Sequence, residues 1–122
     1  MKGGVDMLPA PAVAAGHFIG VRRFGRVELI PLDDLLYVEG SGKYAELVLS
    51  NGQRSFYDQN LGRLESRLPD AFVRIHKSYV VRFTMVSRLI VLRGSRYFVE
   101  FKDGLRLPVG RSRYFYVKSL LV

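Results

Sequence analysis

The sequence predicts a mainly β protein, built of small antiparallel sheets with one or two short helices. From Gly20 onward, apolar and polar residues alternate in short runs, which is the pattern of strands buried on one side. Turn-forming residues separate these runs, and the Asn51-Gly52 pair is typical of a tight hairpin. The 122 residues, 48% of them hydrophobic, suffice for one core but not for two. We therefore expect a single β-rich domain.

The alternating runs indicate at least seven strands. Pro31 ends the first run, because proline has no N–H to donate to a neighbouring strand. The second run is apolar at every position from Leu35 to Val38, so both of its faces are expected to be covered. The expected strands span residues 26–30, 35–39, 44–49, 54–57, 72–77, 86–92, 97–101 and 105–109.

Helical signals are restricted to two segments. Asn60 can cap a helix that Pro69 ends, and a stripe of leucines lies between them. The leucines of this stripe are Leu61, Leu64 and Leu68. We expect a two-turn helix over residues 60–68 that packs on the sheets through this stripe. A second helix is predicted over residues 112–121.

Residues 1–19 are interpreted as a flexible tail or linker, and residues 20–122 as the domain. The alanine-rich tail is interrupted by Pro9 and Pro11, which does not fit a secretory signal. No apolar run approaches the roughly 20 residues that a membrane helix needs. Cysteine is absent, which excludes disulfides, thiolate catalysis and metal sites built on sulfur. We expect a cytoplasmic protein without membrane contact.

The net positive charge is confined to the C-terminal part of the chain. Residues 1–70 contain eight Lys/Arg and nine Asp/Glu, whereas residues 71–122 contain eleven Lys/Arg and two Asp/Glu. The whole chain has a formal charge of +8. Such a field raises the local concentration of polyanions, so nucleic acid is the favoured class of partner.

The features that could suggest an enzyme do not match one. Residues 39–44, EGSGKY, lack the first glycine, the hydroxyl residue after the lysine and the following helix of a phosphate-binding loop. Asp33 and Asp34 are adjacent and typical of a turn. His76 has no histidine, cysteine or carboxylate at ligand spacing. We expect no enzymatic activity, no cofactor and no metal.

A different binding function is open at this point. Arg22 and Arg26 have the spacing of the arginine motif of PilZ domains, small β-barrels that bind a cyclic dinucleotide. Arginines at this spacing could donate paired hydrogen bonds to a phosphate and stack on guanine. The second PilZ signature is missing, and residues 39–44, the nearest approach to it, end in the wrong residue. Cyclic-dinucleotide binding through the two arginines is the alternative function.

Basic residues interrupt the apolar stretch that begins at Phe72. Polar groups occur on both faces of the predicted strand toward its end, so the strand is expected to leave the core there. Lys77 and Arg82 flank the apolar segment 79–81, which is expected to anchor a turn. This segment is predicted to present cations at the surface.

Three segments follow one another along the chain: PLDDLLYVEGSGKYAELVLSNGQ from Pro31, FVRIHKSYVVRFTMV from Phe72 and DGLRLPVGRSRYFYVKSL from Asp103. In this order they closely resemble the LytTR DNA-binding domain, the output module of many bacterial response regulators. The resemblance covers about residues 20–122. It implies about ten short strands with little helix, and loops that enter successive major grooves on one side of DNA and bend it. The loops are residues 40–44, 77–82 and 110–113.

The resemblance also implies roles for individual residues. Base contacts are expected from Lys43, Arg82, Arg111 and Arg113. Phosphate contacts are expected from Tyr44, Lys77 and Arg88. The predicted internal framework consists of Arg74 and His76, and the predicted core includes Tyr37, Phe72, Ile75, Val99 and Leu107. The family usually has Asn at position 82 and Ser at position 110, where this chain has Arg and Gly, and Arg pairs with guanine rather than adenine edges.

The expected partner is double-stranded DNA that carries direct or imperfect repeats, bound by a pair of protomers. A receiver or sensory domain is expected elsewhere in the full protein. The resemblance thus predicts a sequence-specific transcriptional regulator.

Overall fold

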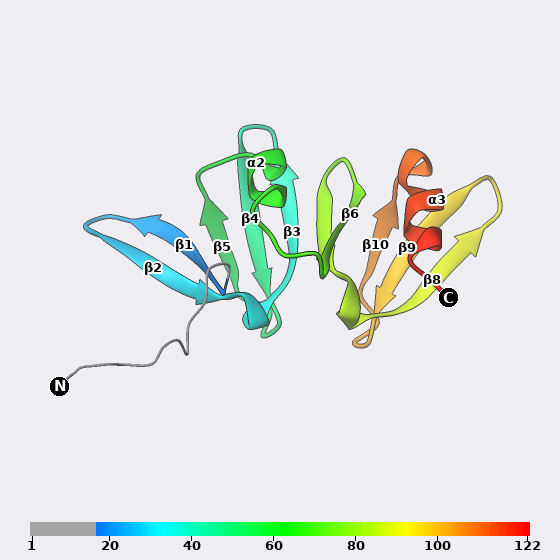
Figure 1. Cartoon of the computed structure of the whole chain (residues 1–122), viewed down its shortest axis with the longest axis horizontal. Coiled ribbons are helices and arrows are strands. Elements are labelled where there is room, and N and C mark those ends of the chain that lie inside the picture. Colours follow the sequence, from blue (N-terminus) through cyan, green and yellow to red (C-terminus); the bar gives the residue numbers. More distant parts are fainter. Residues whose placement is uncertain (1–16) are drawn as a thin grey trace.

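The computed structural model describes residues 17–122, which form ten strands in three antiparallel sheets and two short α-helices (Figure 1). The mainly β fold class is confirmed. The strands are β1 Phe18–Arg23, β2 Arg26–Pro31, β3 Leu35–Ser41, β4 Tyr44–Leu49, β5 Arg54–Tyr57, β6 Phe72–His76, β7 Tyr79–Arg82, β8 Val86–Leu92, β9 Arg96–Phe101 and β10 Arg106–Val109. The α-helices are α2 Leu61–Glu65 and α3 Arg111–Ser119, and the 3-10 turns are η1 Leu32–Asp34 and η2 Phe83–Met85.

The central sheet has five strands in the order β5-β4-β3-β7-β6. A three-stranded sheet, β10-β9-β8, and the two-stranded ribbon β1-β2 lie to either side of it (Figure 1). Within the central sheet β3 is antiparallel to β7, with Glu39 opposite Tyr79 and Tyr37 opposite Val81. The beginning of β7 therefore lies beside the end of β3.

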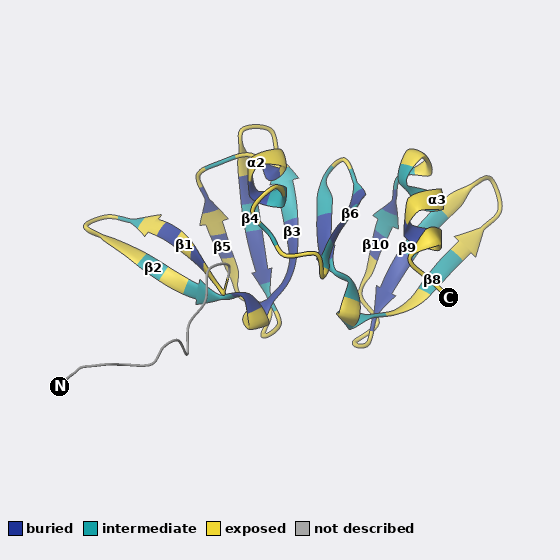
Figure 2. Cartoon of the chain, viewed as in Figure 1, coloured by how far each residue is buried: buried dark blue, intermediate teal, exposed yellow. Residues whose placement is uncertain are grey.

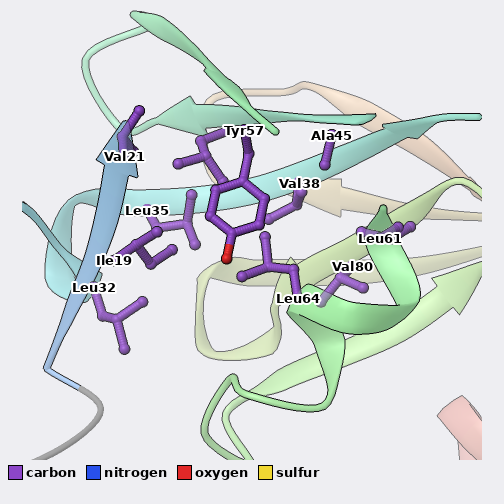
Figure 3. Close-up of a cluster of buried hydrophobic side chains, with 11 residues drawn as sticks. Ile19, Val21, Leu32, Leu35, Val38, Ala45, Tyr57, Leu61, Leu64 and Val80 are labelled. Carbon is purple, nitrogen blue, oxygen red and sulfur yellow. The ribbon is translucent and has the colours of Figure 1, made fainter. Parts of the chain in front are cut away.

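Two separate hydrophobic clusters cover the two faces of the central sheet. Neighbouring residues of one strand alternate between the clusters, so that Val80 belongs to the first and Val81 to the second. The first cluster joins the β1-β2 ribbon and α2 to the sheet (Figure 3), and the second joins β8, β9, β10 and α3. Figure 2 shows that buried residues concentrate in the central strands. The expectation that both faces of residues 35–38 are covered is confirmed.

The predicted core residues are nearly all buried. Tyr37, Ile75, Val99 and Leu107 are at most 6% exposed. Phe72 is half-buried and packs at the edge of the first cluster.

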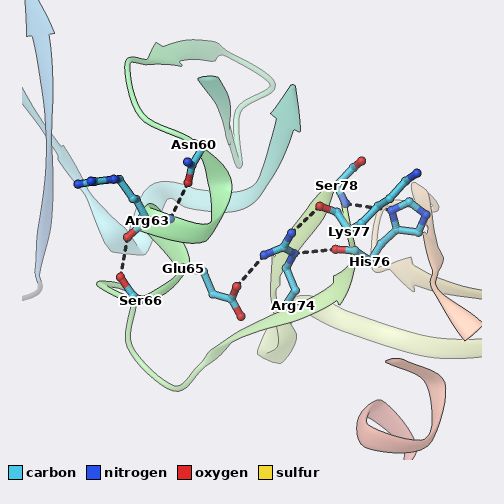
Figure 4. A network of polar contacts seen from close by, with 8 residues as sticks. All are labelled: Asn60, Arg63, Glu65, Ser66, Arg74, His76, Lys77 and Ser78. Atoms are coloured by element: carbon cyan, nitrogen blue, oxygen red, sulfur yellow. Dashed lines mark hydrogen bonds and ion pairs between the residues drawn. The ribbon is translucent and has the colours of Figure 1, made fainter. Parts of the chain in front are cut away.

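Both predicted helices are present, with different ends. The Asn60 side chain caps α2 by accepting a hydrogen bond from the Arg63 N–H, 2.9 Å away (Figure 4). This helix ends at Glu65, three residues earlier than expected, and continues as a turn. In α3 the first residue is Arg111, one residue before the predicted start. No helix among residues 17–122 is long and apolar enough to span a membrane.

Two strands were not expected from the sequence. β1 begins at Phe18, so the predicted tail overlaps the first strand by two residues, and Ile19 is buried in the core. Residues 1–16 of the predicted tail lie outside the described residues. β7 was predicted to be an anchored turn, because the Lys77-Ser78 turn before it lacks the Gly or Asn that marks most hairpins.

Candidate nucleic-acid interface

Three exposed cations lie at one edge of the molecule, two on hairpin turns and one at the start of a helix. Lys43 follows Gly42, whose φ of 63° permits the two-residue turn between β3 and β4. Lys77 occupies the two-residue turn between β6 and β7. Arg111 is the first residue of α3. In Figure 1 these three points form the upper edge of the molecule, which we call the turn edge.

Backbone hydrogen bonds join the three parts of the turn edge. The Gly40 N–H donates to the Ser78 carbonyl, 2.8 Å away, and so links the end of β3 to the β6-β7 turn. The Gly110 N–H donates to the Ile75 carbonyl, also 2.8 Å away, and so links the start of α3 to β6. Because strands in a sheet lie about 4.8 Å apart, the tips of the β3-β4 and β6-β7 hairpins are about 10 Å apart. The spacing of the cations is thus set by the sheet.

Arg74 holds the Lys77 turn from inside (Figure 4). Its Nε donates to the His76 carbonyl at 2.8 Å and its Nη2 to the Lys77 carbonyl at 2.5 Å. A third bond, from Nη1 to Glu65 Oε1 at 2.7 Å, connects the guanidinium to α2. Helix α2 can approach because the strand carries glycine there: a Cβ on Gly40 would lie 2.9 Å from the Cβ of Leu61. The main chain of the turn is therefore fixed while the Lys77 side chain points into solvent.

His76 completes this support. Its Nδ1 accepts a hydrogen bond from the Ser78 N–H at 3.0 Å, which requires that nitrogen to be deprotonated. Burial of the ring lowers the pKa of His76, and the charges of Lys77 and Arg74 lower it further. A neutral imidazole is thus the form that fits the turn.

The cations of the turn edge have no carboxylate partner among residues 17–122. None of the ion pairs in this part of the chain includes Lys43, Lys77 or Arg111, and all three side chains belong to exposed residues. Several arginines elsewhere are paired: Arg54, for example, lies 2.5 Å from Glu46 and 3.5 Å from Glu39. The positive potential of the turn edge is therefore not cancelled locally.

The prediction of a base contact by Arg82 does not agree with the structure. Arg82 ends β7 at the opposite end of the central sheet, roughly 20 Å from Lys43 at about 3.3 Å per residue. Its Nε donates to the Leu35 carbonyl at 2.8 Å, and its guanidinium lies over the Phe72 ring, 5.1 Å from the centroid. These contacts hold β7 to β3 and to the first cluster. One strand separates Arg82 from Lys77, so the two flank a strand rather than a turn.

Arg88 also differs from its expected environment. Its Nη1 lies 2.6 Å from Glu100 Oε1, and Arg106 lies 2.9 Å from the other oxygen of the same carboxylate. Hydrogen bonds from Arg106 and Arg88 lower the pKa of Glu100. Arg88 is thus paired, which does not favour its predicted phosphate contact.

Two further predicted residues lie near the turn edge without joining its three tips. Tyr44 is exposed at the start of β4, with its ring 5.1 Å from that of Phe56. Arg113 is half-buried and lines a hollow of about 420 Å³ between α3 and β6, together with Arg74 and Tyr116. Since Arg113 follows Arg111 by two residues on a helix, their side chains point in different directions.

No role was expected for Arg96, which the structure places beside the turn edge. It lines a hollow of about 270 Å³ with His76 and Arg111. The available signal was the segment Arg93-Gly94-Ser95-Arg96, in which two cations flank a turn.

Arg22 and Arg26, the two arginines of the alternative cyclic-dinucleotide site, do not face a common site. In the β1-β2 register Arg22 is opposite Val27 and Arg23 is opposite Arg26, so Arg22 and Arg26 lie on opposite faces of the ribbon. Each is within 3.6 Å of a carboxylate, Asp58 for Arg22 and Glu28 for Arg26. This arrangement does not support the binding of one phosphate by both arginines.

Comparisons with known proteins identify the family and the fold of the chain. The family model described as the LytTr DNA-binding domain matches residues 25–122. A LytTr DNA-binding domain from Bacillus cereus has the same fold, with a TM-score of 0.73 and 20% identity over 85% of this chain and 95% of that chain.

Two regulators also align with most of the chain. The heme-containing CO-sensing transcriptional regulator RcoM 2 of Paraburkholderia xenovorans is 33% identical over 84% of this chain and 39% of its own length. The transcriptional regulatory protein BtsR of Salmonella typhi is 28% identical over 98% of this chain and 47% of its own length. The chain spans less than half the length of these relatives. With the family match extending from the second strand to the C-terminal residue, the chain belongs to the LytTR family of DNA-binding domains.

Proposed function

We propose that the turn edge binds double-stranded DNA through Lys43, Lys77 and Arg111, which reach the duplex from one side. The observation that carries this proposal is a set of three cations without carboxylate partners in residues 17–122, on three tips joined by backbone hydrogen bonds. A major groove about 12 Å wide admits a hairpin tip, and the tips are fixed before DNA arrives. Little conformational entropy would then be lost in ordering them.

The three tips differ in the contacts that they can make. Arg111 can donate two parallel hydrogen bonds to guanine O6 and N7, the commonest specific contact of this kind. Lys77, on the most strongly supported turn, replaces Arg82 as the central base contact in this proposal. Lys43 provides the third contact, and the Tyr44 hydroxyl can donate to a phosphate beside it. Arg113 adds to the local positive field from behind α3.

At the level of the whole protein, we propose a cytoplasmic, sequence-specific transcriptional regulator that is not an enzyme. Two protomers would bind direct or imperfect repeats and bend the DNA between them. A sensory or receiver domain would control this DNA-binding domain, as in the output part of a response regulator. The names of the relatives support this organisation, since one is a CO-sensing regulator and another a transcriptional regulatory protein, and both are more than twice as long as the segment aligned.

The experiment begins by selecting bound duplexes from a random library and measuring their affinity by fluorescence anisotropy at several salt concentrations. With about six phosphate contacts, affinity should fall roughly thousandfold between 50 and 200 mM salt. Lys77→Ala should cost about 1–3 kcal/mol and relax the preference at one base pair. Lys102→Ala is the matched control, because Lys102 is equally exposed in the β9-β10 turn at the opposite end of the molecule (Figure 1).

Two results would contradict the proposal. One is an affinity that does not change with salt, since counterion release must accompany contacts to phosphates. The other is an equal loss of affinity in Lys77→Ala and Lys102→Ala, which would mean that only net charge matters.

A further inference from the structure

A hollow beside the turn edge has the charge and position of a second kind of DNA contact. It lies between the β8-β9 hairpin, the ends of β6 and β10, and the start of α3. Arg96, Arg111 and His76 are among the residues that line it, and none of its lining residues is acidic. Neither Arg96 nor Arg111 has an ion pair among the described residues. The Arg96 guanidinium at this open hollow is suited to a phosphate group beside the base that Arg111 would contact.

The hairpin that carries Arg96 is held against α3. The rings of Tyr97 and Tyr114 stack with their centroids 3.8 Å apart and their planes 11° apart. Tyr97 adjoins Arg96 in β9, and Tyr114 is one helical turn after Arg111 in α3. The stack therefore holds the main chain that carries Arg96 against the helix that carries Arg111.

The other side of the hollow is fixed as well. The Gly110 N–H donates to the Ile75 carbonyl, which places the start of α3 against the main chain that precedes His76. The tip between β8 and β9 is a three-residue turn with positive φ at Gly94 and Ser95, and Arg93 and Arg96 stand at its two ends. Within residues 17–122, the one hydrogen bond of the Arg96 side chain is long, 3.4 Å from Nε to the Arg93 carbonyl. Arg96 is exposed, which leaves its guanidinium accessible to a ligand.

We propose that the β8-β9 hairpin is a fourth DNA-contacting element, whose Arg93 and Arg96 bind backbone phosphates beyond the base contacted by Arg111. Figure 1 shows the tip of this hairpin on the same upper edge as the other three tips, farthest from the β1-β2 ribbon. The proposal rests on the proposed function of the turn edge and extends it along the duplex. Because phosphates carry no sequence information, this contact strengthens binding to every duplex alike.

The test uses Arg93→Gln/Arg96→Gln, which removes two charges and retains most of the side-chain length. Each lost phosphate contact lowers the slope of log affinity against log salt by about 0.9, so the double variant should have a slope smaller by about 2 in magnitude. The sequence motif selected from a random library should remain that of the wild type. The matched control is Arg22→Gln/Arg26→Gln, which removes two charges around another hairpin tip, that of β1 and β2, and should leave the slope unchanged.

The possible outcomes separate this inference from the proposed function. An unchanged slope in Arg93→Gln/Arg96→Gln, or an equal change in the control, overturns the fourth contact while the wild type still binds DNA. Wild-type protein without salt-dependent DNA binding overturns the proposed function itself. Inorganic phosphate, followed by ³¹P NMR, tests for a free-phosphate site. Binding that is lost in Arg96→Gln, with no change in the DNA slope, would show that the hollow takes free phosphate instead.

Discussion

Basic residues occur at both ends of the central sheet, but their surroundings differ. At the turn edge, Lys43, Lys77 and Arg111 are exposed and lack carboxylate partners within residues 17–122. At the other end, Arg82 donates to a backbone carbonyl and lies over an aromatic ring. A cation available to DNA is thus distinguished by its surroundings rather than by its residue type.

The difference also concerns what supports each cation. Arg74 is basic too, but all of its hydrogen bonds are made inside the molecule, to two carbonyls of the Lys77 turn and to Glu65. It stabilises the position from which another cation reaches outward. An exposed basic residue and the half-buried one behind it can therefore form one functional unit.

The largest expected effect compares two pairs of lysines. Lys43→Ala/Lys77→Ala should lower the affinity for the selected duplex by on the order of a hundredfold or more, because each contact contributes about 1–3 kcal/mol. Lys102→Ala/Lys118→Ala removes the same charge away from the turn edge and should change affinity only slightly. Anisotropy titrations at one salt concentration give both values. Similar losses in the two variants would abolish the distinction between the two ends.

The next effect is on stability rather than on DNA binding. Arg82→Ala leaves the Leu35 carbonyl without this donor and removes the contact with Phe72, which together should lower the free energy of unfolding by about 2 kcal/mol. Urea denaturation measures this change, and Arg82→Lys should recover part of it. DNA affinity and the selected motif, measured well below the unfolding temperature, should match the wild type. A relaxed preference at one base pair would restore Arg82 as a base contact.

A smaller effect concerns the ion-paired end of the three-stranded sheet. Glu100→Gln releases Arg88 and Arg106, and it removes a carboxylate whose folded-state pKa is lowered. In the wild type, this carboxylate stabilises the fold above its unfolded pKa of about 4.5, and the stabilisation is lost as the pH falls through the folded pKa. In the variant, the free energy of unfolding should therefore decrease less between pH 5 and pH 3 than in the wild type. Its DNA salt slope should not change, whereas a steeper slope would show that a freed Arg88 reaches phosphate.

The smallest effect is the pH dependence of the Lys77 turn. His76 has a folded-state pKa below its ordinary value of 6.5, so between these two values the unfolded chain binds more protons than the folded one. Stability without DNA should therefore fall as the pH is lowered from above 6.5 toward the folded pKa. His76→Gln, which can still accept from the Ser78 N–H, should reduce this dependence in urea midpoints compared at pH 7.5 and pH 5.5. An unchanged dependence would exclude His76 as its source.

Much of the fold can be predicted from the sequence, because the alternation of apolar and polar residues and the turn residues are local properties. Eight strands and both helices could be predicted in this way. β7 was missed because it has only four residues and follows a turn without glycine or asparagine. β1 was missed because the segment before Gly20 reads as a continuation of the alanine-rich tail.

The site was harder to predict, because it depends on register. Lys77 and Arg82 are five residues apart, and only the pairing of β7 with β3 shows that they lie at opposite ends of a sheet. Arg96 joins Arg111 through a stack between two tyrosines that are distant in the sequence. Alternation along one strand contains no information about such neighbours.

The two backbone hydrogen bonds from Gly40 and Gly110 have a consequence for the nucleic acid. Tips joined through main-chain atoms cannot adjust their separation to each new duplex, so in the proposed complex the duplex would have to deform to reach all of them. Flexible pyrimidine–purine steps deform at a lower energetic cost than stiff A-tracts. Base pairs that no side chain contacts would then influence which DNA sites are bound, because their flexibility sets the cost of deforming the duplex.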